Sequence, residues 1–328
     1  IPLKALLYPD YRTLEVTDRP KPRPRAGEVL VKVAACGLCG SELESYKSRS
    51  PRRKPPLIFG HEFCGTVVAI GPDGDETDLG RKVVVNALVP CGACVRCERY
   101  EEHLCAKRQV FGMHRPGAFA EFVTAPVHVL LDWPEDLPPE AACLAEPLGN
   151  GVHMTRLTAG RIRKTVLVIG AGPIGLMAQQ AFSALVGSRV WVADLHAHRL
   201  DVARHLGAHG TICNADSDLV ETIRRETDGE GVDLVIDAVG AASTKQQSIE
   251  ASRPGGAAVW IGLHEDGMSL DSFQVTLPER TVFGTYAARL DDLREALNLI
   301  GSGRVDVTSW PTQYSLTSGV RAFNRMLR

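Results

Sequence analysis

Residues 165–175 read TVLVIGAGPIG, an apolar run that leads directly into a glycine-rich turn. The apolar run is typical of a buried strand, and the residues after the turn, PIGLMAQQAFSAL, are typical of a helix. Gly170–Gly175 fits the pattern G-x-G-x-x-G, which binds a dinucleotide only where a strand precedes it and a helix follows. The alternative is a glycine-rich turn that binds nothing.

Each part of this motif has a physical role. Gly170 permits the tight turn, Gly172 lets a pyrophosphate approach the backbone, and Gly175 allows the helix to pack closely on the strand. The helix N-terminus then offers free N–H groups to the phosphates. Asp194 ends the next apolar run, RVWVAD, where a carboxylate accepts the ribose hydroxyls and repels a 2′-phosphate. The sequence therefore favours NAD over NADP. Arg199 is expected over the adenosine, or else on a helix surface.

The strand and helix pattern continues after this motif. From Lys164 onward, the apolar runs RVWVAD, VDLVIDAVG and AAVWIGL alternate with helix-like stretches, which predicts a parallel sheet covered by helices. The last of these runs could extend the sheet of a second copy across a two-fold axis. The preceding part of the chain is rich in short β-type runs broken by Gly and Pro, which predicts a β domain of barrel type. These runs are Glu28–Ala34, Gly65–Ile70, Lys82–Asn86 and Phe119–Thr124.

Four cysteines stand close together in the run CGACVRCERYEEHLC. They are Cys91, Cys94, Cys97 and Cys105. Thiolates at this spacing can turn toward one centre and satisfy a tetrahedral zinc ion, which predicts a structural rather than a catalytic metal because no position stays open. Disulfides or chance are the alternatives, but disulfides between such near neighbours are geometrically unfavourable.

The bulk composition limits the function classes. The 328 residues suffice for about two domains, and the net charge of -2 gives no overall basic footprint for nucleic acid or anionic membrane. No apolar run is long enough for a membrane span, and thiolate ligands without a secretion signal suggest a reducing cytoplasm. The basic stretch Lys47–Lys54 is read as a solvated loop, or alternatively as an attraction for an anionic substrate.

Three further segments contain side chains that bind zinc. They are Cys36–Glu42 (CGLCGSE), Gly60–Glu62 (GHE) and Ala145–Asn150 (AEPLGN). A catalytic zinc needs three protein ligands and an open position for water or substrate. Each segment alone is a weak signal, since a lone His is more often a structural group. The remaining cysteines Cys64, Cys143 and Cys213 are expected to pack in the interior.

Taken together, CGLCGSE, GHEFCG, the four-cysteine lobe, AEPLGNGVH, GAGPIG and the acid of WVAD resemble a known family. Over essentially the whole chain, the sequence is similar to the zinc-containing medium-chain dehydrogenase/reductase superfamily, nearest its sorbitol-dehydrogenase-like polyol branch. The resemblance implies an α/β protein with a GroES-like β-barrel catalytic domain and a Rossmann coenzyme domain whose parallel sheet is doubly wound. It places the catalytic domain at residues 1–148 and 288–328, with the structural zinc lobe at 90–106, and the NAD-binding domain at 149–287.

The resemblance also implies roles for single residues. Cys39 and His61 would bind the catalytic zinc, with Glu62 and Glu146 as further ligands or neighbours whose order stays open, and Ser41 would hydrogen-bond the substrate oxygen. Further residues would line the coenzyme site: Pro173, Ile174, Ile261, Gly262, Leu263, Thr285 and Ala287.

Several positions depart from the family pattern. Glu44 stands where the family often has a proton-relaying His, and Ser45 stands where sorbitol dehydrogenases have Tyr. Ala287 and Ala288 replace an Arg and a Tyr, so fewer side chains can hydrogen-bond the hydroxyl groups of a linear polyol. A different pocket could be shaped by Phe111, His114, Arg289 and Glu121, although core or surface roles are equally compatible with each.

We therefore expect an NAD-dependent zinc dehydrogenase that converts a secondary alcohol of polyol, sugar or cyclitol type to a ketone. It would hold two zinc ions per chain, one catalytic and one structural, and act as a cytoplasmic homo-dimer or homo-tetramer with neither nucleic acid nor membrane as partner. The alternatives are a zinc-independent quinone or enoyl reductase of the same superfamily, and a non-catalytic NAD-binding sensor or structural protein.

Overall fold

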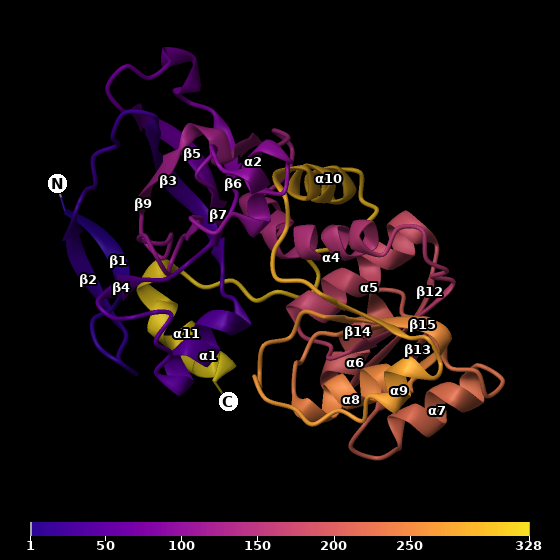
Figure 1. Cartoon of the computed structure of the whole chain (residues 1–328). Helices are drawn as coiled ribbons and strands as arrows, with labels where there is room; N and C mark the ends of the chain where they lie inside the picture. The colour runs from indigo at the N-terminus through magenta and orange to yellow at the C-terminus, as the bar shows by residue number, and fades with distance from the viewer. Residues whose placement is uncertain (1, 328) are drawn as a thin grey trace. The chain divides into compact units, whose positions relative to one another are not determined.

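The computed structural model describes residues 2–327, which divide into two compact units (Figure 1). The first contains the described residues up to Glu146, Arg289–Gly301 and the described residues from Val307 on; the second contains Pro147–Ala288 and Ser302–Asp306. The second unit thus includes the short segment Ser302–Asp306, which the predicted boundaries assign to the catalytic domain. The side chain of Gln180 holds it by donating to the Asp306 carbonyl at 2.9 Å and accepting from the Asp306 N–H at 2.8 Å.

The first unit is built on antiparallel sheets. One sheet has the order β2-β1-β4: β2 (Glu15–Pro20), β1 (Pro2–Tyr8) and β4 (Leu57–Ile58). A larger sheet has the order β10-β6-β5-β3-β9: β10 (Leu130–Asp132), β6 (Lys82–Val85), β5 (Glu62–Ile70), β3 (Glu28–Gly37) and β9 (Phe122–Pro126). A short pair is formed by β7 (Leu88–Val89) and β8 (Gln109–Val110). The larger sheet encloses an apolar core to which Val31, Phe63 and Val85 contribute, so the predicted β domain is present.

Helices of the first unit are short, and several follow strands or loops that bear candidate ligands. They are α1 (Gly40–Ser48), α2 (Val95–Glu98), α3 (Pro139–Ala142), α10 (Leu290–Gly301) and α11 (Gly319–Met326), while α4 (Ala145–Leu157) continues into the second unit. Turns of 3-10 helix lie at Glu76–Asp78, Glu102–Leu104, Val127–Val129 and Leu316–Ser318. Helix α1 starts directly after β3, so the end of that strand and the first turn of the helix place Cys36, Cys39 and Ser41 within a few residues of one another.

The second unit is a six-stranded parallel sheet with the order β13-β12-β11-β14-β15-β16. Its strands are β11 (Thr165–Ile169), β12 (Arg189–Asp194), β13 (Gly210–Cys213), β14 (Val232–Asp237), β15 (Ser252–Trp260) and β16 (Thr281–Gly284). Its helices are α5 (Pro173–Val186), α6 (Ala197–His205), α7 (Leu219–Glu226), α8 (Ala242–Glu250) and α9 (Phe273–Thr276). This strand order is that of a doubly wound Rossmann sheet, in which the direction of succession reverses between β11 and β14. The predicted α/β fold class is confirmed.

The place of β15 in this sheet corrects one expectation. Strand β15 pairs with β14 on one side and with β16 on the other, so its hydrogen-bonding edges are both occupied. The run AAVWIGL therefore cannot add its strand to the sheet of another copy, because it is an inner strand. The sequence did not reveal this, since the short strand TVFG at Thr281–Gly284 carries no strong alternation of its own.

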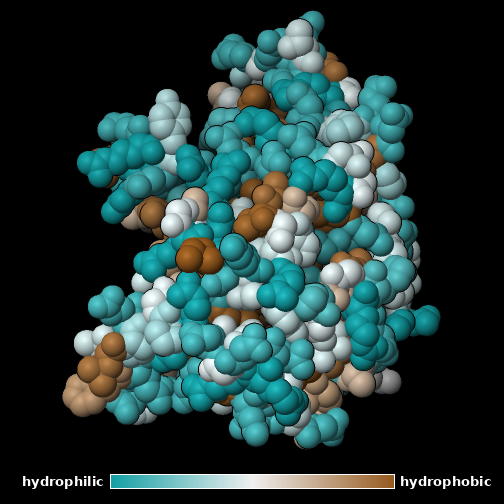
Figure 2. Space-filling model, turned by 90° about the vertical axis from the view of Figure 1, so that its right-hand side faces the viewer, coloured by the Kyte–Doolittle hydropathy of each residue, from teal (hydrophilic) through white to brown (hydrophobic). Residues whose placement is uncertain are grey.

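The surface seen in Figure 2 is mainly hydrophilic, as expected for a chain in which 23% of the residues are charged. Apolar residues are scattered among the hydrophilic ones on this face. Among the described residues, no helix combines the length and the apolar character that crossing a membrane requires.

Candidate functional site

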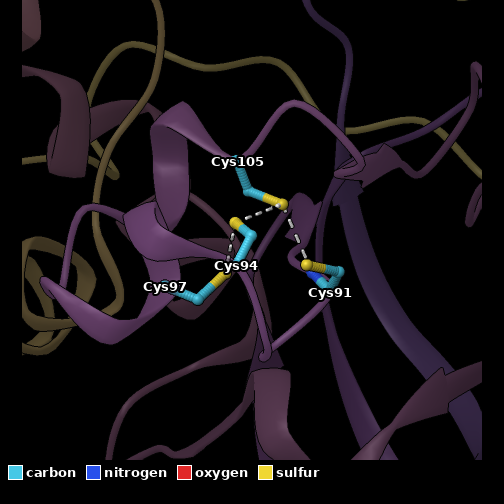
Figure 3. A group of neighbouring side chains, drawn as sticks. All are labelled: Cys91, Cys94, Cys97 and Cys105. Carbon is cyan, nitrogen blue, oxygen red and sulfur yellow. Dashed lines mark hydrogen bonds between the residues drawn. The ribbon is translucent and has the colours of Figure 1, made fainter.

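The Cys91, Cys94, Cys97 and Cys105 side chains point toward one another from a loop around α2 (Figure 3). The Cys94 sulfur lies 3.6 Å from that of Cys97 and 3.8 Å from that of Cys105. A tetrahedron with metal–sulfur bonds of about 2.3 Å has edges of about 3.8 Å, so these sulfurs fit the spacing of a zinc site. The Cys97 backbone N–H lowers the pKa of the Cys94 thiol to about 6, which favours the thiolate that a metal requires.

A second group consists of Cys39, His61 and Glu62, whose ligand atoms all lie within 4.8 Å of one another. Cys39 is the residue before α1, His61 precedes β5 and Glu62 begins β5. Register explains how β5 reaches the start of α1, because Glu62 pairs with Gly37 at the end of β3. Thiolate, imidazole and carboxylate are all zinc ligands, and three of them leave a fourth position open.

Two partners orient this group. The buried carboxylate of Glu42 accepts from the Gly60 N–H at 2.8 Å and lies 3.0 Å from the His61 Nδ1. With Nδ1 engaged in this way, Nε2 is the imidazole nitrogen that remains for a metal. The Ser41 hydroxyl donates to the Cys39 sulfur at 3.4 Å. Glu42 lies in the quoted CGLCGSE run, one helical turn after Cys39, so this helical spacing could have identified it.

Electrostatics show that the site favours a cation. His61 is buried, which opposes its charge, but the Glu42 carboxylate and the Cys39 thiolate raise the pKa of its imidazole well above the ordinary value. Burial also opposes the Cys39 thiolate, yet His61 and the Ser41 hydroxyl lower the pKa of that thiol. Burial, followed by repulsion from Cys39, raises the pKa of Glu62. An anionic pocket around one imidazole matches the charge of a divalent metal, so these residues fit zinc.

Glu146 is not a member of this group of three. It occupies the first turn of α4 and is buried, and burial raises the pKa of its carboxyl. Its ligand atom does not join those of Cys39, His61 and Glu62 within 4.8 Å, although its charge acts on Glu62. Of the two glutamates that the sequence left undecided, the structure thus brings Glu62 into the group.

The glycine-rich turn has the geometry that a dinucleotide needs. Gly170 has a φ of +101°, and a Cβ on Gly175 would lie 1.8 Å from the Gly170 carbonyl oxygen. A Cβ on Gly172 would meet nothing within 4 Å, so this residue leaves open space in front of the N-terminus of α5. Exposed Pro173 and half-buried Ile174 begin that helix. The turn therefore fits a pyrophosphate group.

Asp194 ends β12 beside this turn. One carboxylate oxygen accepts from the Ala171 N–H at 2.8 Å and the other from the His196 N–H at 2.9 Å. The Arg199 guanidinium lies 3.7 Å from the first oxygen and is half exposed. Asp194 therefore stands beside the glycine-rich turn, as the sequence predicted, and Arg199 stands next to it.

Remaining coenzyme-site candidates follow β15 and β16. The N–H groups of Ile261 and Gly262 donate to the Asp237 carbonyl at 3.1 and 3.0 Å, and the Thr285 N–H donates to the Trp260 carbonyl at 3.0 Å. Leu263 is exposed and Ala287 is buried.

The loop after β15 also lies very close to the loop after β14. A Cβ on Gly240, whose φ is +83°, would lie 2.1 Å from the Gly262 carbonyl carbon, and a Cβ on Gly262 would lie 2.2 Å from the Gly240 nitrogen. Backbone therefore packs directly on backbone at this point, and the two loops fix each other.

One important residue of the first unit was missed. Arg53 is only 5% exposed, so the reading of Lys47–Lys54 as a solvated loop is wrong for this side chain, although Arg52 and Lys54 beside it are exposed. Its guanidinium reaches Ser41, Ser45 and Gly112. No motif in the sequence separates Arg53 from its basic neighbours.

The fold and these two groups define a two-unit oxidoreductase of the alcohol-dehydrogenase type, with a GroES-like part and a Rossmann part. Family models agree: the alcohol dehydrogenase GroES-like domain matches residues 25–135, and the zinc-binding dehydrogenase domain matches residues 173–302. An L-threonine 3-dehydrogenase of Pyrococcus abyssi is 34% identical over 89% of this chain and 85% of its own. The chain belongs to the zinc-containing medium-chain dehydrogenase/reductase superfamily, as the sequence motifs indicated.

Solved structures give the same result. A protein of E. coli CFT073, described as a short chain alcohol dehydrogenase complexed with NADH, has a TM-score of 0.92 and 27% identity, covering 99% of this chain and 95% of its own. A zinc-binding dehydrogenase of Sinorhizobium meliloti 1021, bound to NADP, has a TM-score of 0.91 and 28% identity, covering 98% and 95%. Both coenzymes thus occur among similar proteins.

Proposed function

We propose that the protein is an NAD-dependent zinc dehydrogenase that oxidises a secondary alcohol to a ketone. The observation that carries this proposal is the approach of Cys39, His61 and Glu62 within 4.8 Å, with Glu42 on the far nitrogen of the imidazole. A zinc-independent reductase of the superfamily has no use for this ligand set. We also infer that Cys91, Cys94, Cys97 and Cys105 bind a second, structural zinc.

Protein groups have separate tasks in this reaction. Cys39, His61 and Glu62 would hold the metal, with Glu146 as a neighbouring carboxylate that can exchange with Glu62. When bound, zinc would supply Lewis acidity to the alcohol oxygen and the dinucleotide would supply the hydride acceptor. The Ser41 hydroxyl would donate a hydrogen bond to the substrate oxygen.

The second unit would hold the coenzyme. Gly170, Gly172 and Gly175 leave room for the pyrophosphate, and the first turn of α5 donates to it. Asp194 accepts the ribose hydroxyls, which supports NAD over NADP. The further coenzyme contacts that we propose are Pro173, Ile174, Arg199, Ile261, Gly262, Leu263, Thr285 and Ala287.

Two substrate classes have support. Family motifs favour a polyol, sugar or cyclitol, whereas the name of the Pyrococcus abyssi relative favours a β-hydroxy-α-amino acid such as L-threonine. Alanine at the buried positions 287 and 288 weakens the grip on a linear polyol.

A substrate panel tests the function. NADH formation is followed with polyols, sugars, cyclitols, sugar phosphates and L-threonine, and each active substrate is repeated with NADP. We expect turnover of at least one secondary alcohol, faster with NAD, in protein that contains two zinc ions per chain. Zinc-loaded protein that binds NAD but oxidises no member of the panel would instead support the non-catalytic alternative.

We also expect a homo-oligomer in a reducing compartment such as the cytoplasm. All nine cysteines of the chain are free in the described structure, as thiols in such a compartment are. Light scattering of the zinc-loaded protein distinguishes a dimer from a tetramer.

A further inference from the structure

Arg53 places a buried positive charge behind the residues that would contact the substrate. Its Nη2 donates to the Ser41 hydroxyl oxygen at 3.1 Å, and its Nη1 donates to the Ser41 carbonyl and the Ser45 hydroxyl, each at 3.0 Å. Its Nε donates to the Gly112 carbonyl at 3.2 Å. Because burying a charge is unfavourable unless it is hydrogen-bonded, these contacts explain how the fold tolerates a guanidinium here.

The chemistry of the two side chains restricts what Ser41 can do. A guanidinium carries only donors, whereas a hydroxyl has a single hydrogen and lone pairs that accept. Facing Arg53, the Ser41 oxygen must therefore accept, and its one hydrogen is left for another partner. In this structure that partner is the Cys39 sulfur, 3.4 Å away. The donors run in one direction, from Arg53 to Ser41 to Cys39.

We propose that Arg53 is a positioning residue that fixes the Ser41 hydroxyl as a donor on the side of Cys39, where the substrate oxygen would accept this hydrogen in place of the sulfur. This inference rests on the proposed function, in which Ser41 hydrogen-bonds the substrate oxygen beside Cys39. A donor that is already oriented stabilises charge on that oxygen without the cost of reorganisation. Without Arg53, the hydroxyl can rotate and present a lone pair instead.

A merely structural role is the competing explanation. Arg53 also joins α1 to the backbone at Gly112, so its loss could simply loosen this part of the fold. Ser45→Ala provides the matched control, because it removes one hydrogen bond of Arg53 and leaves its contact with the Ser41 hydroxyl in place. Ser45→Ala also removes the bond from the Ser45 hydroxyl to the Ser41 carbonyl, but it touches no contact of the Ser41 hydroxyl, so we expect it to lower stability and to change kcat by less than about 3-fold.

A double-mutant cycle separates the two explanations. Arg53→Met, Ser41→Ala and the double variant are compared with the wild type in the zinc-loaded enzyme. We expect Arg53→Met to lower kcat by about 10- to 100-fold with little change in KM, as for loss of a group that orients a reacting residue. In the Ser41→Ala background, the same substitution should change kcat by less than about 2-fold. Additive effects in the two backgrounds would overturn the inference.

A second readout needs no turnover. In protein that carries cobalt at the Cys39, His61 and Glu62 site and zinc at the four-cysteine site, the thiolate-to-metal absorption band reports hydrogen bonding at the Cys39 sulfur. We expect Arg53→Met and Ser41→Ala to shift this band in the same direction, and the double variant to show no further shift. If Arg53→Met does not fold, Arg53→Lys takes its place: it keeps the charge but loses the fork of donors, so a smaller shift and a smaller loss of kcat are expected.

Outcomes distinguish this inference from the proposed function. A large effect of Ser41→Ala with an additive Arg53 effect overturns the inference and leaves the proposed function standing. If Ser41→Ala changes neither kcat nor the cobalt band, both the inference and the substrate role of Ser41 fail. If no alcohol is oxidised at all, the cobalt band decides alone: a shared shift supports the inference and additive shifts overturn it.

Discussion

The two candidate metal sites of the first unit use cysteine in opposite ways. Cys91, Cys94, Cys97 and Cys105 come from one short loop, lie at or near the surface except for Cys105, and form a closed set of like ligands. Cys39 comes from the start of α1 and the consecutive residues His61 and Glu62 from the start of β5; the last two are buried, and Glu42 lies beside the imidazole. A local, complete ligand set suits a structural metal, whereas a buried, mixed and incomplete set suits catalysis. The comparison teaches that a cysteine in a metal site is assigned a structural or a catalytic role by two things: the number of ligands beside it, and the groups that hydrogen-bond those ligands.

The largest expected effect on kcat comes from removing a ligand of the group Cys39, His61 and Glu62. Cys39→Ser should lower kcat by about 1000-fold or more, because a catalytic metal contributes several kcal/mol to the transition state. Binding of NAD, followed by NADH or nucleotide fluorescence, should stay within about 3-fold of the wild type. Retained turnover in a variant that has lost one of its two zinc ions would contradict the assignment of this group as catalytic.

A smaller effect is expected from the partner of His61. Glu42→Gln keeps the shape of the side chain but removes its charge, so it should lower zinc affinity or kcat by about 10- to 100-fold. Competition with a chelator measures the affinity, and Glu15→Gln, at an exposed carboxylate of the same unit, serves as the control. Equal chelator resistance of Glu42→Gln and the control would show that the imidazole needs no carboxylate partner.

Loss of a ligand from the four-cysteine group should lower the stability of the protein and leave kcat nearly unchanged. Cys97→Ser should reduce the metal content from two zinc ions to one per chain and lower Tm, with a loss of about 3 kcal/mol corresponding to roughly 6–12 °C. Below the new Tm, kcat should change by less than about 3-fold. Calorimetry and metal analysis check this result, and a loss of turnover as large as that of Cys39→Ser would remove the contrast between the two groups.

The finest distinction lies among the thiols of metal-free protein. Cys94, with a pKa of about 6, is a thiolate at neutral pH, whereas burial raises the pKa of Cys64 to about 12. Burial, together with the hydrogen bond that the Cys97 thiol donates to the Cys94 thiolate, raises the pKa of Cys97 to about 11. Iodoacetamide should therefore modify Cys94 first, as mapped by peptide mass spectrometry, and added zinc should protect it. Equal rates at Cys94 and Cys97 would contradict these pKa values.

Local patterns made much of the fold predictable. The glycine-rich turn and Asp194 are close in sequence to the strands that they follow, and the four-cysteine lobe lies within one loop, so spacing alone revealed them. That Cys39 lies next to His61 and Glu62 could be predicted only from the resemblance to a known family, because strand pairing brings together these two distant parts of the sequence.

Features that depend on distant contacts were not predictable. Arg53 is buried because it contacts Gly112, which lies far along the chain, and nothing in its basic segment shows this. The inner position of β15 depends on a weak strand that follows it, β16. Burial of both glutamates gave no choice between Glu62 and Glu146, which required the positions of their oxygen atoms.

The contact between Gly240 and Gly262 limits how this protein can evolve or be redesigned. Each residue occupies the room that a side chain on the other would need, so a substitution at one cannot be accommodated by shrinking its neighbour. A side chain at either position therefore requires the backbone of the other loop to move. A mutant library aimed at new coenzyme use should therefore keep both positions fixed and vary the surrounding residues instead.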